Sequence, residues 1–258
     1  MEISTGYLNV IHAVLEPEFD LEERDIHVWY ADLDSVGGGF EEFWGTLSEE
    51  ERMRAARFYF PRDRERFIIC RGILRTLLAN YLNTGPSRVH FCYGKNGKPQ
   101  VIDLPGKTKI MFNLSRSDGV ALYAFSQDNE VGVDIEHVRD ISEQEEIVEK
   151  FFSLRENKLF HSLPSSKKRQ AFFAWWTRKE AFIKAVGKGL AYPLKRFDVS
   201  FSPNEPARLL SIDGDPVKAS QWFMLSFQPA AGFIAALAMK GQDWRPHFFQ
   251  WPHQTTSS

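Results

Sequence analysis

The alternation of apolar and polar positions predicts two successive series of helices and short strands. In the first half, Ser48 and Glu51 have the spacing of a capping box, so a helix is expected to start there. A second helix is expected after Asp63, because apolar residues recur at helical spacing, as at Ile69 and Ile73. Strand-like alternation marks residues 26–33, 89–93, 110–114, 121–125 and 131–136.

The second half repeats this order. A polar helical stretch over 142–152 and a basic loop over 165–169 precede a long aromatic helix over 170–186, which Gly187 is suited to end. Strands over 197–201, 222–227 and 233–239 follow. The repetition predicts an α+β fold of two similar subdomains, each with helices packed on a small, mainly antiparallel sheet. We expect an N-terminal subdomain over 1–128, a C-terminal subdomain over 129–240 and a peripheral tail over 241–258.

Composition and charge are those of an ordinary globular protein. The 258 residues carry a formal net charge of −2, so no overall basic field favours nucleic acid. Neither a targeting peptide nor a membrane-length apolar run is recognisable, so a cytoplasmic location is the expectation. Cys70 and Cys92 form no Cys-x-x-Cys pair and are expected to be small buried hydrophobes. The spacings typical of zinc sites, nucleophile elbows, Walker loops and dinucleotide fingerprints do not occur.

Two segments carry candidate chemistry. In the expected strand Gly132-Val-Asp-Ile-Glu136, the two-residue period places Asp134 and Glu136 on one face. In the expected helix Trp176-Thr-Arg-Lys-Glu-Ala-Phe-Ile-Lys184, a spacing of four aligns Trp176, Glu180 and Lys184. A solvated strand face and an exposed helix pair are the ordinary alternatives. The apolar surroundings favour a bound cation, and three carboxylates suit Mg²⁺ with a phosphate-bearing ligand.

Further residues could hold a phosphate. Arg54, Lys98, Ser115 and Arg116 lie in helix or turn contexts where hydrogen-bond donors could converge. The segment Phe112-Asn-Leu-Ser-Arg-Ser117 is predicted to be a polar turn that grips a phosphate, and an ordinary turn is the alternative.

Together these motifs resemble the Sfp-type 4′-phosphopantetheinyl transferase family. The resemblance rests on the Phe112 to Ser117 segment, the Gly132 to Glu136 strand, Phe151-Phe-Ser-x-x-Glu156, and the Trp176 to Lys184 helix with Gly187-Lys-Gly-Leu190. It runs from about residue 47 to 190, and the order and spacing match. It implies a pseudo-twofold α+β monomer.

The resemblance also implies a reaction and a role for each site residue. Members transfer the 4′-phosphopantetheine arm of coenzyme A to a serine of an acyl or peptidyl carrier protein and release adenosine 3′,5′-bisphosphate. The metal ligands for Mg²⁺ would be Asp134, Glu136 and Glu180, and the catalytic residues would be Glu156 as general base with Lys184 and Lys179 beside the leaving phosphate. Coenzyme A would be bound through Arg54, Lys98, Ser115 and Arg116. The carrier protein would dock near residues 187–194.

Two positions depart from the family pattern, and two other functions stay open. Arg116 stands where members often have histidine, and Glu51 stands where the enzyme that gives the family its name has a lysine.

A Mg²⁺-dependent nuclease is one alternative function, because Asp134 with Glu156-Asn-Lys158 imitates an Asp…Glu-x-Lys arrangement. A catalytically silent carrier-binding module is the other. The expected partners remain coenzyme A and carrier proteins, without nucleic acid or membrane.

Overall fold

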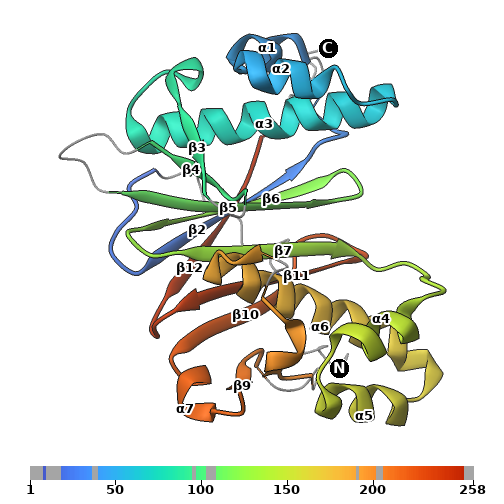
Figure 1. Ribbon diagram of the computed structural model, residues 1–258. Coiled ribbons are helices and arrows are strands. Elements are labelled where there is room, and N and C mark those ends of the chain that lie inside the picture. The colour runs from blue at the N-terminus through green and yellow to red at the C-terminus, as the bar shows by residue number, and fades with distance from the viewer. Residues whose placement is uncertain are drawn as a thin grey trace.

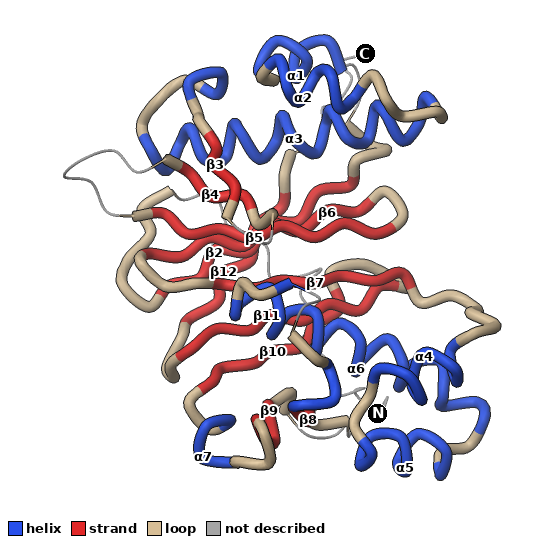
Figure 2. Tube along the Cα trace, in the orientation of Figure 1, coloured by secondary structure: helices blue, strands red, loops and turns tan. Residues whose placement is uncertain are grey.

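Two sheets packed face to face form the centre of the protein, and a long helix covers the outer face of each (Figure 1; Figure 2). The computed structural model describes residues 8–9, 19–36, 40–94, 97–102, 109–189, 192–201 and 206–252. Within these ranges, no helix is both long enough and apolar enough to span a bilayer.

The upper sheet belongs mainly to the N-terminal half of the chain. Its strand order is β12-β2-β6-β5, where β12 is Arg245–Gln250, β2 is Asp25–Asp32, β6 is Val120–Gln127 and β5 is Ile110–Ser117. The helices of this half are α1 (Phe40–Thr46), α2 (Glu49–Ala55) and α3 (Pro61–Leu82), with a 3-10 turn at Pro86–Arg88 and a hairpin of β3 (Phe91–Tyr93) and β4 (Pro99–Val101).

The lower sheet belongs mainly to the C-terminal half. Its strand order is β1-β10-β11-β7, where β1 is Leu8–Asn9, β10 is Trp222–Gln228, β11 is Phe233–Lys240 and β7 is Val131–His137. The remaining elements are α4 (Gln144–Phe151), α5 (Leu154–Ser162), α6 (Ser165–Val186), a 3-10 turn at Leu194–Arg196, β8 (Phe197–Val199), β9 (Leu209–Ile212) and α7 (Pro216–Ala219).

Both halves share one topology. Each runs strand, long helix, strand, strand, and in each the third strand lies in the middle, giving β2-β6-β5 and β7-β11-β10. These three strands pair antiparallel in both sheets. The predicted α+β fold of two similar subdomains is therefore confirmed. The boundary between residues 128 and 129 stays a prediction.

Apolar side chains fill three spaces between the four layers. One core lies between α3 and the upper sheet, and another lies between α6 and the lower sheet. The third joins the sheets, with Val28 and Leu122 from above and Val133 and Leu237 from below. Since Val133 and Ile135 face this central core, the strand period turns Asp134 to the other face of β7, against which α6 packs.

Each terminal strand pairs in the sheet of the other half: β1 lies in the lower sheet and β12 lies in the upper sheet. β12 pairs in parallel with β2, and β1 pairs in parallel with β10. The expectation of a peripheral C-terminal tail is therefore wrong for residues 245–250. Phe249 lies in the core beneath α3 and Phe248 lies between the sheets, so burial of alternate side chains holds this strand in place.

Two further expectations need correction. The segment from Phe112 to Ser117 is part of strand β5 and not a turn, because its polar side chains find partners on β7, as described below. Cys70 is buried as predicted, but Cys92 is exposed. Among the residues that the structure describes, its strand β3 pairs only with β4 in a two-stranded sheet, and this leaves one face open to solvent.

Gly132 sets how closely α6 approaches β7. A Cβ atom at this position would lie 2.0 Å from the carbonyl oxygen of Ala181 and 2.4 Å from the amide nitrogen of Ala185, both backbone atoms of α6. Backbone atoms of a packed helix cannot move aside as a flexible side chain can, so only glycine fits here.

We predict that Gly132→Ala lowers the free energy of unfolding by about 1–3 kcal/mol or more, because overpacking usually costs this much. Urea denaturation measures the loss. The matched control is Gly45→Ala in α1, where a Cβ atom would meet nothing within 4 Å. This control should be neutral or stabilising by up to about 1 kcal/mol. Equal midpoints for the two variants would contradict the close packing of α6 on β7.

Candidate functional site

A groove beside α6 collects the carboxylates that the sequence singled out. Its volume is about 610 Å³, and its lining comes from β7, α4, α6 and the segment after α6. The lining residues are Asp134, Glu136, Lys150, Phe151, Trp176, Glu180, Tyr192, Pro193, Leu194 and Lys195. The structure thus brings the three predicted metal ligands together in one groove with aromatic and aliphatic side chains.

Polar side chains of β5 tie the edge of β7 to the upper half. Asn113 accepts a hydrogen bond from the Val133 amide at 2.9 Å through its Oδ1. Ser115 donates to Asp134 Oδ1 at 2.8 Å, and Ser117 donates to Glu136 Oε2 at 3.0 Å. Alternate side chains of β5 therefore contact alternate side chains of β7. Hydroxyl groups from the N-terminal half of the protein thus orient both carboxylates. The sequence singled out Ser115 as a site residue, and it included Asn113 and Ser117 only as members of the polar segment from Phe112 to Ser117.

Lys184 completes this arrangement from α6. Its ammonium group donates to Asp134 Oδ1 at 2.7 Å, to Ser115 Oγ at 2.9 Å and to the Val133 carbonyl at 3.1 Å. Asp134 is only 4% exposed, so this cation compensates a charge that has little access to water.

Two carboxylate oxygens in the cluster remain without a partner. Asp134 Oδ2 and Glu180 Oε1 are buried and accept no hydrogen bond from any residue that the structure describes. Burial, together with the negative charge of Asp134, raises the pKa of Glu180 to about 7 and also raises the pKa of Glu136. The three acids are thus close enough to repel one another, and one ammonium group does not satisfy them all.

This chemistry fits a divalent cation. Hard oxygen donors with unfilled lone pairs are the ligands that Mg²⁺ prefers. Within the described ranges, however, no group of three or more His, Cys, Asp or Glu side chains is already spaced to hold a metal ion. The assignment of Asp134, Glu136 and Glu180 as metal ligands therefore stays a prediction.

Glu156 and Lys179 lie elsewhere, inside the C-terminal half. They form an ion pair of 2.8 Å with side chains 1% and 0% exposed. Glu156 also closes the capping box of α5 with Ser153 and accepts from the Val199 amide at 3.0 Å, while Lys179 donates to two backbone carbonyls. Neither residue lines the described groove. Their buried position outside the groove lining does not by itself support catalytic roles. These roles stay a prediction.

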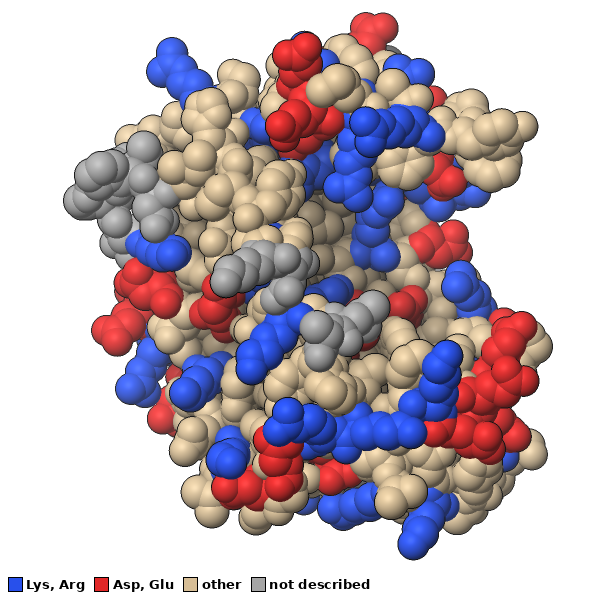
Figure 3. All heavy atoms as spheres, in the orientation of Figure 1, with Lys and Arg blue, Asp and Glu red and all other residues tan. Residues whose placement is uncertain are grey.

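The predicted coenzyme A residues are spread over several places. Lys98 donates to Glu130 at 2.5 Å and to the backbone carbonyls of Val131 and Lys184, so it braces the end of α6. Arg116 is exposed on β5. Arg54 lines a second pocket of about 650 Å³ between α2 and α3, together with Arg57 and Arg71. In Figure 3, Lys and Arg side chains gather on the upper half above the hollow between the halves.

Comparison with known proteins covers both halves of the chain. Residues 37–127 match the family model described as 4′-phosphopantetheinyl transferase, N-terminal. Residues 130–238 match that of the 4′-phosphopantetheinyl transferase superfamily.

Two relatives with the same description and one solved structure are similar to this chain. The 4′-phosphopantetheinyl transferase HetI of Nostoc sp. is 37% identical over 235 residues, which cover 91% of this chain and 96% of HetI. The 4′-phosphopantetheinyl transferase Sfp of Bacillus subtilis is 33% identical, covering 62% of this chain and 68% of Sfp. A solved holo-[acyl-carrier-protein] synthase of Thermotoga maritima has a TM-score of 0.33 and 20% identity, covering 44% of this chain and 64% of that one. The family models and the full-length similarity to HetI show that this chain belongs to the 4′-phosphopantetheinyl transferase superfamily and is a 4′-phosphopantetheinyl transferase.

Proposed function

We propose that this enzyme transfers the 4′-phosphopantetheine arm of coenzyme A to a serine of an apo acyl or peptidyl carrier protein, with Mg²⁺ as cofactor. The serine oxygen bonds to the phosphorus that carries the pantetheine arm. The bond from that phosphorus to the oxygen bridging the two phosphates breaks, and adenosine 3′,5′-bisphosphate leaves. The serine proton passes to a base.

The observation that carries this proposal is the pair of unpartnered oxygens, Asp134 Oδ2 and Glu180 Oε1, beside the ammonium group of Lys184. Asp134, Glu136 and Glu180 would hold Mg²⁺, which when bound supplies positive charge to pyrophosphate oxygens. Lys184 adds a fixed positive charge at the same place. Phosphoryl transfer depends mainly on such positioning and charge stabilisation, so this corner of the groove suits the pyrophosphate.

The apolar part of the groove suits the pantetheine arm. Trp176, Phe151 and Tyr192 line it next to the acids. Apolar walls exclude water from the reacting groups and strengthen the electrostatic interactions there. Lys150 and Lys195 also line the groove, so an acidic carrier surface could approach it. Of the predicted docking segment, residues 190 and 191 lie outside the described part of the chain.

Glu156 is the base that the family resemblance implies. Both of its oxygens already accept hydrogen bonds, from Ser153, Val199 and Lys179. A serine proton would therefore reach it only through an intermediary such as water. The same buried position weakens the nuclease alternative, which needs Asp134 and Glu156 on one site.

The proposed reaction is tested by incubating the protein with coenzyme A, Mg²⁺ and several apo carrier proteins. We predict a phosphopantetheine-sized mass increase on the carrier serine and release of adenosine 3′,5′-bisphosphate, measured by intact-protein and nucleotide mass spectrometry. Coenzyme A binding without a mass increase on any carrier would favour the silent-module alternative. Mg²⁺-dependent cleavage of DNA would favour the nuclease.

The metal assignment is tested by Asp134→Asn and Glu180→Gln. Each variant should lose about 100-fold or more of the transfer rate, the scale of removing one preorganised electrostatic contact. Each should also weaken Mg²⁺ binding in the presence of coenzyme A, measured by isothermal titration calorimetry. The matched control is Glu149→Gln on α4, an exposed acid outside the groove lining. Undiminished Mg²⁺ binding in both variants would refute these ligands.

The role of Glu156 is tested by stability. Glu156→Gln has one acceptor oxygen where Glu156 uses two, so it cannot accept from both the Ser153 and the Val199 amides. It also leaves the Lys179 charge buried without its counter-charge, so it should cost about 3–5 kcal/mol in the free energy of unfolding. Replacing the pair by Glu156→Gln with Lys179→Met should recover most of that loss, measured by urea denaturation. Unchanged stability of Glu156→Gln, combined with lost turnover, would instead indicate a purely catalytic role.

A further inference from the structure

Two neighbouring aromatic side chains project into solvent where α2 leads into α3. Tyr59 is 89% exposed and Phe60 is 61% exposed, and neither is part of the three apolar cores of the described chain. They pack on each other edge to face, with ring centres 4.9 Å apart. Phe58, by contrast, packs on Phe67 of α3 with ring centres 5.3 Å apart. Folding therefore accounts for Phe58 but not for the pair Tyr59 and Phe60, which we call the aromatic corner.

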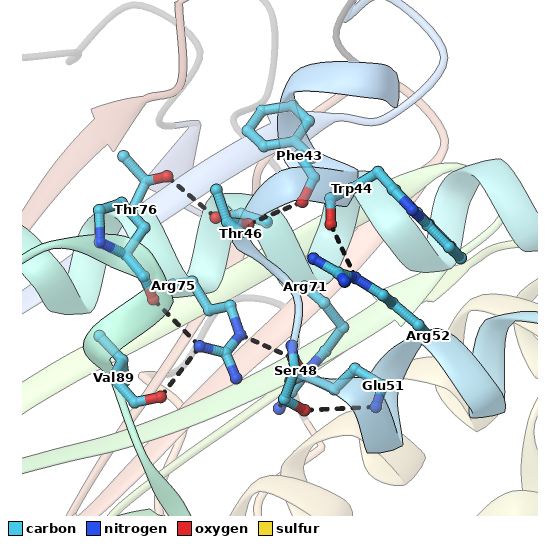
Figure 4. Close-up of polar contacts among 12 residues, drawn as sticks. Phe43, Trp44, Thr46, Ser48, Glu51, Arg52, Arg71, Arg75, Thr76 and Val89 are labelled. Atoms are coloured by element: carbon cyan, nitrogen blue, oxygen red, sulfur yellow. Dashed lines mark hydrogen bonds and ion pairs between the residues drawn. The ribbon is translucent and has the colours of Figure 1, made fainter.

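The helices on either side of the aromatic corner are fixed to each other. Glu51 of α2 is buried, and two arginines of α3 converge on it (Figure 4). Its Oε1 accepts a hydrogen bond from Arg71 Nε and its Oε2 accepts one from Arg75 Nε, each at 2.7 Å. Because the two helices cannot easily shift against each other, the corner is presented in one arrangement, and a partner that binds it orders little further structure.

A series of charged contacts connects the start of α3 to the end of β7. Asp34 accepts from Arg66 Nε at 2.8 Å, and Arg66 Nη1 lies 3.7 Å from Asp118 Oδ1 in the turn between β5 and β6. Asp118 Oδ2 lies 3.0 Å from His137 Nδ1. His137 directly follows Glu136, which lines the groove. The helix that begins at the aromatic corner is therefore held on the side of the molecule where the groove lies.

The view in Figure 1 agrees with this placement. The connection between α2 and α3 lies on the same side of the molecule as α4, one helix in the upper half and the other in the lower half. Since α4 contributes Lys150 and Phe151 to the groove lining, a protein that reaches into the groove from this side would pass close to both halves.

Positive charge surrounds the aromatic corner. Within residues 54–66, five arginines accompany only two acids, Asp63 and Glu65. On the lower half, Lys150 and Lys195 line the groove. Lys and Arg side chains also gather on the upper half above the hollow in Figure 3. An acidic partner surface with exposed apolar side chains would complement this combination of aromatic rings and cations.

We propose that the aromatic corner is a docking contact for the carrier protein, provided by the N-terminal half of the enzyme. The inference rests on the proposed function and deepens it, because it adds a contact surface far from the segment after α6. The contact serves the folded carrier and not coenzyme A, since neither ring lines the groove or the pocket between α2 and α3. Aromatic residues are among those that contribute most to the affinity of protein interfaces.

The test measures binding of apo carrier proteins to the full chain by isothermal titration calorimetry. The acceptor serine of each carrier is replaced by alanine, so that no transfer occurs during the titration. The double variant Tyr59→Ser with Phe60→Ser should raise the dissociation constant about 10-fold or more, the scale of losing one strong interface contact. Phe60 is the N-cap residue of α3, a position that serine suits, so the variant should keep its fold.

Steady-state transfer to unmodified carriers gives a second readout. In the double variant the KM for the carrier should rise, whereas kcat and the KM for coenzyme A should stay at the wild-type values. The matched control is Val217→Ser on α7, which removes an apolar side chain that is 68% exposed and lies outside the groove lining. It should keep the wild-type affinity for the carrier.

Three results would overturn the proposal. One is an unchanged carrier affinity in the double variant. Another is a raised KM for coenzyme A without any change for the carrier. The third is loss of binding to phosphatidylserine vesicles in the double variant with unchanged carrier affinity, which would assign the aromatic corner to a membrane surface.

The failures of the two proposals are distinguishable. Transfer to a carrier whose affinity is the same for wild type and double variant overturns the docking role and leaves the reaction standing. Carrier binding that the double variant weakens, without transfer to any carrier, supports the docking contact and overturns the reaction. Absence of carrier binding by the wild type, together with absence of transfer, overturns both.

Discussion

The ammonium group of Lys184 is the contact on which the site depends. It joins α6 to Asp134 of β7 and to Ser115 of β5, and β5 belongs to the other half of the protein. Without it, the buried charge of Asp134 would lose its ammonium partner while lying beside Glu136 and Glu180. The close approach that allows this contact comes from Gly132, where the backbone of α6 leaves no room for a side chain. The packing of α6 on β7 and the compensation of charge in the groove therefore depend on each other.

The two halves contribute different charges to a common surface. The C-terminal half supplies the carboxylates and an apolar groove, and the N-terminal half supplies the arginines of α2 and α3. The exchanged terminal strands, β1 and β12, and the side chains of β5 fasten these halves to each other. An anionic ligand would match the arginines directly, whereas at the carboxylates it would need a bound cation between them and its own oxygens.

Local periodicity in the sequence predicted much of the arrangement of the carboxylates and Lys184. The two-residue period placed Asp134 and Glu136 on one face, and the four-residue spacing placed Glu180 and Lys184 together, because both rules act within one element. The turn expected around Ser115 was wrong, since partners on β7 stabilise polar residues in a strand and are invisible to local patterns. For the same reason, β12 was taken for a tail, and the buried pairing of Glu156 with Lys179 was not foreseen. Arg71 and Arg75 left a weaker signal, two charges four residues apart inside an apolar helix.

The most direct measurement is a crystal structure with coenzyme A and Mn²⁺, with the ion located by its anomalous scattering. We predict an anomalous peak bound by Asp134 Oδ2 and Glu180 Oε1, the two oxygens that lack partners in the described structure. We also predict that the pyrophosphate of coenzyme A contacts the same ion. A bound coenzyme A whose metal ion lies away from both oxygens would contradict it.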